Sequence, residues 1–97
     1  MISLSTYVNS ILEKKGWTRS RFARELNFIE KSHGLGLTAR QDVTNILNGG
    51  INVGAITLAK WEVALGLPED SLMCFAPAKI TRSGKQRLKE FKKMIRS

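Results

Sequence analysis

The stretch "TARQDVTNILNG", residues 38–49, predicts a short helix. Thr38 is a residue type that caps helix N-termini, and Asn48-Gly49 is a typical helix end. The apolar residues between these ends recur at helical spacing on one side and are Ala39, Val43, Ile46 and Leu47. We therefore expect one face of this helix to pack on a core.

The opposite face of this predicted helix carries amides and a guanidinium, where surface helices usually carry Lys and Glu. Its polar residues are Arg40, Gln41, Thr44, Asn45 and Asn48. In the major groove of DNA, side chains that make two hydrogen bonds at once distinguish the bases, since Asn and Gln suit adenine and Arg suits guanine. The pattern indicates base reading, and the alternative is an ordinary solvated surface.

Helix patterns also dominate the rest of the chain, and we found no long strand alternation and no repeat. We expect an all-α fold, a compact bundle of about five helices followed by a basic amphipathic helix or tail. The predicted helices cover about residues 3–15, 18–31, 38–48, 55–65 and 68–73, and a last one is capped by Ser83. Pro77 separates a domain, residues 1–78, from an extension, residues 79–97.

The positive charge is concentrated in the extension. The net charge of the chain is +8, and residues 79–97 hold eight basic residues against Glu90 alone, which leaves +7 there and +1 in the other 78 residues. Such a segment suggests a polyanionic partner, nucleic acid before membrane. Three arrangements stay open: a helix packed on its own domain or on a second subunit, a flexible arm along DNA phosphates, and an interfacial membrane helix, which the narrow apolar face disfavours.

Length and composition indicate a single small soluble domain. The 97 residues are 42% hydrophobic, and no run of about 18 apolar residues exists that would span a membrane. The N-terminus lacks the basic start and apolar core of a signal peptide. Cys74 is the single cysteine, and we expect it to be a small buried side chain. Because one cysteine cannot form an internal disulfide, the sequence indicates a reducing cytoplasm.

Several ordered features together resemble the helix-turn-helix domain of the lambda-repressor or Cro type. These are a helix beginning at Thr18 with Phe22-Ala23 and Leu26, the polar helix ending at Asn48-Gly49, and the "LxxWxxxLGL" pattern from Leu58 to Leu67. The resemblance covers about residues 2–75. It implies a DNA-binding domain whose polar helix lies in the major groove.

The resemblance also implies roles for individual residues. The base readers would be Arg40, Gln41, Thr44 and Asn45, and the contacts to the DNA backbone would come from Arg19, Arg21, Lys31, Asn48, Gly49 and Asn52. One departure is "FIEKSHGLGL", residues 28–37, because the family joins these two helices by a turn of about three or four residues. We expect the second helix to continue to about Lys31 and the inserted loop to contact DNA or a protein.

Enzyme chemistry finds no support in the sequence. His33 is the only histidine and has no Cys, His or acidic cluster at metal-ligand spacing, so we expect neither a catalytic site nor a metal nor a cofactor. We expect Trp17 and Trp61 to be core residues.

These observations predict a small cytoplasmic transcriptional regulator, a Cro-like repressor from a phage or bacterium that binds a palindrome in double-stranded DNA as a homodimer. Residues 68–75 or the basic extension would form the dimer interface. Two alternatives remain. One is an antitoxin or another protein-interaction module that uses residues 28–37 or the extension. The other is a non-specific nucleic-acid-binding protein.

Overall fold

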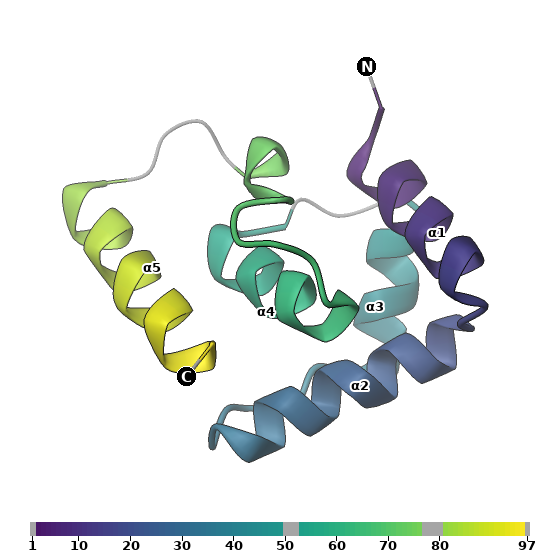
Figure 1. The fold of residues 1–97 in the computed structure, drawn as a ribbon, viewed down its shortest axis with the longest axis horizontal. Helices are drawn as coiled ribbons and strands as arrows, with labels where there is room; N and C mark the ends of the chain where they lie inside the picture. Colours follow the sequence, from purple (N-terminus) through teal and green to yellow (C-terminus); the bar gives the residue numbers. More distant parts are fainter. Residues whose placement is uncertain (1, 50–52, 77–80, 97) are drawn as a thin grey trace. The chain divides into compact units, whose positions relative to one another are not determined.

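The computed structural model describes residues 2–49, 53–76 and 81–96, and its regular structure in these ranges is entirely helical (Figure 1). The all-α prediction is confirmed. The helices are α1 (Leu4–Lys15), α2 (Arg19–Ser32), α3 (Arg40–Leu47), α4 (Ala55–Leu65), the short 3-10 helix η1 (Met73–Phe75) and α5 (Arg82–Ile95). The chain forms two compact units, Met1–Asn52 and Val53–Ser97. The basic helix α5 lies in the second unit, while the assignment of residues 1–78 to a DNA-binding domain stays a prediction.

The first unit contains α1, α2 and α3, and α3 packs against both other helices. Ser3 caps α1 by accepting a hydrogen bond from the Thr6 amide, and Thr18 caps α2 by accepting one from the Arg21 amide. Both caps remove an unsatisfied amide from a helix end. The buried apolar side chains are Val8, Leu12, Phe22, Ala23, Leu26, Val43, Ile46 and Leu47. Burial of each larger one contributes roughly 1.5–3 kcal/mol to folding, so this core fixes α3 on its neighbours.

The connection between α2 and α3 differs from the sequence prediction at one residue. Helix α2 does continue through Lys31, to Ser32, but Thr38 does not cap α3. Its amide donates to Glu30 Oε1 at 2.9 Å, and its hydroxyl donates to Glu30 Oε2 at 2.6 Å. Because Glu30 is fully buried, its carboxyl group needs hydrogen-bond donors, and Thr38 supplies two. Helix α3 therefore begins at Arg40, after Ala39.

The second unit contains α4, η1 and α5, and α5 packs against α4. Most of the apolar residues that the spacing turns inward are buried, namely Leu58, Trp61 and Leu65 of α4 and Leu88 and Ile95 of α5, while Val63 and Phe91 are half-buried. Helix α4 ends at Gly66, whose φ of 70° is in the left-handed region that glycine adopts without strain.

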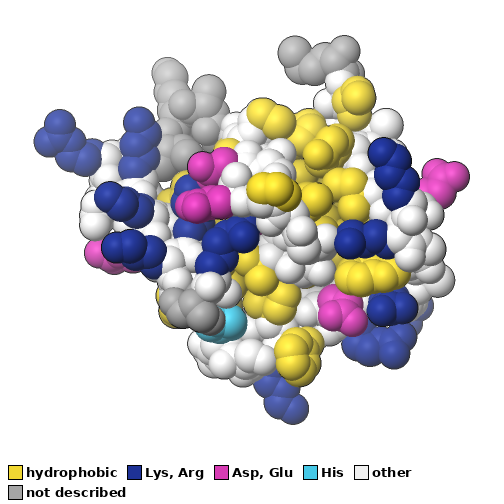
Figure 2. Space-filling view, viewed as in Figure 1, with side chains coloured by type: hydrophobic (Ala, Val, Ile, Leu, Met, Phe, Trp, Pro, Cys, Tyr) yellow, Lys and Arg dark blue, Asp and Glu magenta, His cyan; other side chains and the backbone are white. Residues whose placement is uncertain are grey.

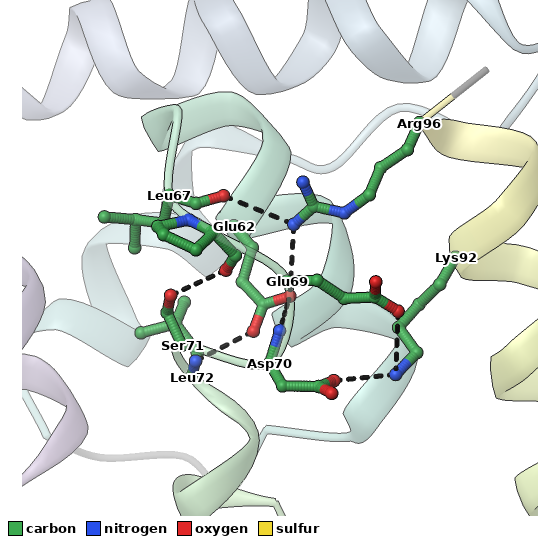
Figure 3. A network of polar contacts seen from close by, with 9 residues as sticks. Glu62, Leu67, Glu69, Asp70, Ser71, Leu72, Lys92 and Arg96 are labelled. Carbon is green, nitrogen blue, oxygen red and sulfur yellow. Dashed lines mark hydrogen bonds and ion pairs between the residues drawn. The ribbon is translucent and has the colours of Figure 1, made fainter.

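Two predicted helix starts in the second unit are wrong. The segment after Pro68 forms turns before η1, because Asp70 has φ 69° and its amide, like that of Leu72, donates to the buried Glu62 (Figure 3). A right-handed helix cannot continue through such a residue. Thr81, two residues earlier than the sequence suggests, caps α5 in place of Ser83 by accepting a hydrogen bond from the Gly84 amide.

The side chain of Cys74 is exposed, which contradicts the expectation that it is buried. It lies in η1 between two half-buried residues. The apolar character of this segment therefore did not predict which of its side chains is buried. Pro77, the expected boundary, lies outside the described residues.

Candidate nucleic-acid interface

Helix α3 divides into a buried side and a polar side, as its sequence predicts, except that Ala39, expected on the buried side, is exposed and precedes the helix. Arg40 and Gln41 are exposed, Thr44 and Asn45 are half-buried, and the apolar residues between them are buried. Asp42 is also exposed in the first turn, and sequence reasoning did not single it out. Because a carboxylate accepts a hydrogen bond from cytosine N4, Asp42 widens the set of bases that this face is able to read.

Two of the predicted base readers are hydrogen-bonded to each other. Gln41 Nε2 donates to Asn45 Oδ1 at 3.0 Å, one helical turn apart. The bond leaves Gln41 with its carbonyl oxygen and one N–H, and it leaves Asn45 with both N–H donors. A donor and an acceptor side by side match the edge of adenine. The pair is therefore held in place and still able to read a base.

Two of the predicted backbone contacts also meet. Arg19 Nη1, at the start of α2, donates to Asn48 Oδ1, at the end of α3, over 2.8 Å. A guanidinium has five N–H donors, so four remain for a phosphate. The amides at the start of α2 add a favourable field for an anion at this position. Gly49 follows with φ 84°, and a Cβ there would lie 3.6 Å from Ser5 Oγ in α1.

Helix α3 is consequently tied to α2 at both ends. The Glu30–Thr38 hydrogen bonds hold the residues that lead into α3, and the Arg19–Asn48 hydrogen bond holds its last turn. A third bond, from Asn9 Nδ2 to the Leu47 carbonyl at 3.2 Å, joins the same end to α1. Helix α3 has only eight residues, too few for a stable isolated helix, so its orientation depends on these bonds and on the core.

Arg21 and Lys31 are exposed at opposite ends of α2. The Arg21 guanidinium lies 4.8 Å from the centroid of the Trp17 ring, and Lys15 Nζ lies 5.2 Å from the same centroid. Trp17 is thus a half-buried partner of two cations, where a core residue was expected. Lys31 is about 18 Å of helix from Arg19, so the structure does not place these two predicted phosphate contacts together.

Sequence reasoning missed Glu30, which positions α3 from a fully buried site. The only signal was an acidic residue one turn before a helix end and eight residues before a Thr. Asn52, another predicted backbone contact, lies outside the described residues.

Within residues 2–49, 53–76 and 81–96, no group of three His, Cys, Asp or Glu side chains is arranged to hold a metal ion, and no helix has both the length and the apolarity to cross a membrane. His33 Nδ1 lies 2.9 Å from the carbonyl oxygen of Ile29 in its own helix. Comparison with protein-family models, curated proteins and solved structures finds no match. The assignment of the candidate interface is therefore supported by its sequence pattern and its geometry alone.

Proposed function

We propose that the first unit binds double-stranded DNA sequence-specifically through α3 and that the protein acts as a small Cro-like repressor in the cytoplasm. The observation that supports this most directly is the polar face of α3, with Arg40, Gln41 and Asn45, on a helix tied to α2 at both ends. Base reading needs donors and acceptors that are positioned before DNA arrives, because the entropy lost in ordering them would weaken binding.

In this proposal the contacts fall into two classes. Arg40, Gln41, Thr44 and Asn45 read base edges. Arg19, assisted by Asn48, binds a phosphate and sets the position of α3 in the groove. A single helix reads few base pairs, and each good bidentate contact contributes about 1–3 kcal/mol of discrimination. We therefore propose a homodimer on a palindrome, with half-sites about one turn of DNA apart.

We place the dimer interface at residues 68–75. The other segment suggested by the sequence, α5, already buries Leu88 and Ile95 within the second unit. Cys74 is exposed in η1 and is the only cysteine of the chain, so it serves as a single probe of this interface. A spin label at Cys74 should show one short inter-label distance when the protein is bound to a palindrome. Labels that remain far apart would contradict this interface.

The first experiment is the selection of bound duplexes from a random pool at about 150 mM salt, a level that weakens purely electrostatic binding. We expect an enriched palindrome. Gln41→Ala should then weaken binding to the selected site by about 1–3 kcal/mol and leave binding to unrelated DNA nearly unchanged. Glu13→Ala, an exposed change in α1, is the control for general effects. Equal losses on all sequences would refute base reading by α3.

A second function, binding of a protein partner, is favoured by two exposed apolar side chains in and beside the inserted loop. Phe28 is 70% exposed and Leu37 is 62% exposed. Large apolar side chains at such exposure are typical of interaction sites when they lie together. If this function holds, Phe28→Ser should abolish capture of the partner and leave selection of DNA unaffected.

A further inference from the structure

Two basic residues at the C-terminal end of α5, Lys92 and Arg96, make their contacts inside the second unit. Lys92 Nζ donates to Asp70 Oδ1 at 2.7 Å and lies 3.4 Å from Glu69 Oε1 (Figure 3). Arg96, just after α5, donates to the Leu67 carbonyl at 3.3 Å and lies 3.6 Å from Glu62 Oε1. The hydrogen bond that Lys92 donates to Asp70 raises the pKa of Lys92, so this side chain stays charged. These two cations hold α5 on α4.

The acidic residues of this unit contact Lys92, Arg96 or Gln86. Residues 53–97 contain Glu62, Glu69, Asp70 and Glu90 as their only acids. The first three contact Lys92 or Arg96, and Glu90 accepts a hydrogen bond from Gln86 Nε2 at 3.2 Å. In the part of the chain that the structure describes, Arg82, Lys85, Arg87 and Lys89 are exposed and make no ion pair.

Three of these exposed cations form a line along one side of α5, which we call the basic stripe: Arg82, Lys85 and Lys89. Its members are three or four residues apart, the spacing that places side chains on one side of a helix. Like charges at this spacing destabilise a helix, and a polyanion relieves that repulsion. The stripe is about 10 Å long, a length over which one DNA strand carries about three phosphate charges. Figure 2 shows the dark blue Lys and Arg side chains gathered over α5 at the left of the view.

We propose that the basic stripe binds the phosphate backbone of DNA, so that the second unit contributes sequence-independent affinity beside the base reading of the first unit. The proposal rests on the proposed function for its class of partner. An anionic membrane is the less favoured polyanion, because an interfacial helix inserts its apolar face and Leu88 and Ile95 of α5 are already buried. The stripe needs no sequence in its partner, since Lys and Arg contact phosphates as charges.

The test compares two double variants that remove the same charge. Lys85→Gln with Lys89→Gln removes two members of the stripe. Lys14→Gln with Arg87→Gln removes two exposed cations outside it. Affinity for one fixed duplex is measured from about 50 to 300 mM salt, after circular dichroism has shown that both variants are folded. The slope of log K against log salt is negative, and each phosphate contact adds about 0.9 to its magnitude. We therefore expect the magnitude of the slope to decrease by about 2 for the stripe variant and to stay unchanged for the control.

Three outcomes separate this proposal from the proposed function. Equal slopes for both variants, on a protein that does select a palindrome, would overturn the stripe and leave base reading intact. A smaller slope for the stripe variant alone, on a protein that enriches no sequence, would support the stripe and overturn base reading. If the stripe variant alone loses binding to vesicles that contain an anionic lipid, while both variants have the same salt slope on DNA, the stripe is not a DNA contact. It would then be assigned to a membrane surface.

Discussion

Two buried glutamates, one in each unit, act in similar ways. Each lies one turn before the end of a helix, in "EKSHGLGLT" from Glu30 and "EVALGLPED" from Glu62. Each is followed four residues later by a glycine, with φ 67° in one case and 70° in the other. The next residue donates its amide to the backbone carbonyl of the glutamate over 2.8 Å in both, and the amide eight residues on donates to Oε1. A similar local sequence thus ends α2 and α4 and attaches the following segment.

The two glutamates differ in what binds the second carboxyl oxygen. In the first unit the hydroxyl of Thr38 donates to Glu30 Oε2. In the second unit the backbone amide of Leu72 donates to Glu62 Oε2 at 2.8 Å, while Arg96 forms an ion pair with Oε1 (Figure 3). The first arrangement leads directly into α3, and the second joins α4 to the turns before η1 and to the end of α5. The same local feature therefore positions the candidate interface in one unit and supports the fold in the other.

The largest expected effect is the loss of the Glu62 carboxyl group. Glu62→Ala leaves two backbone amides without their acceptor, and an unsatisfied buried amide costs about 1–3 kcal/mol, so we expect a loss of about 2–5 kcal/mol in the unfolding free energy. Urea unfolding of a Trp17→Phe background measures it, since Trp61 fluorescence then reports on the second unit. An unchanged midpoint would show that these amides find other acceptors.

A smaller effect is expected at Thr38. Thr38→Val keeps the backbone hydrogen bond to Glu30 and removes only the hydroxyl donor, so we expect a loss of about 1–2 kcal/mol in stability. Because Thr38 precedes α3, binding to a selected DNA site should weaken in addition. Thr57→Val, a change in α4 of the second unit, is the control. If the Thr38→Val variant loses stability but keeps full DNA affinity at a temperature where it is folded, this hydrogen bond supports the fold and does not position α3 for binding.

The smallest effect concerns the pH dependence of the second unit. The pKa of Lys92 is raised in the folded protein above its ordinary value of 10.5, chiefly by Asp70, so its contribution is complete below that pH and is lost as the pH rises through the folded pKa. Lys92→Gln should therefore cost up to about 1 kcal/mol at neutral pH, and the difference from the parent should shrink above about pH 10.5. A difference that is the same at pH 7 and pH 11.5 would contradict an ionic role.

The comparison also shows where sequence reasoning works and where it stops. Helix ends at Gly16 and Gly66 and caps at Ser3 and Thr18 were predictable, because each depends on a few neighbouring residues. Thr38 has the same residue type as Thr18 and a different role, since a buried carboxyl group lies within its reach. The start of α5 shows a related limit: Thr81 and Ser83 are both capping residues, and their order along the chain did not indicate which one is used.

The candidate interface likewise has some features that the sequence determined and others that only the tertiary structure decided. The sequence alone determined that α3 has a polar face with Arg40, Gln41 and Asn45, because helical spacing assigns residues to faces. Only the tertiary structure decided that Arg19 meets Asn48 across 29 positions of sequence, that Lys92 meets Asp70 across 22, and that Arg82, Lys85 and Lys89 make no ion pair within the described residues. The physical reason is that spacing and caps act within one or two turns, whereas burial and ion pairing depend on which distant segments cover a side chain.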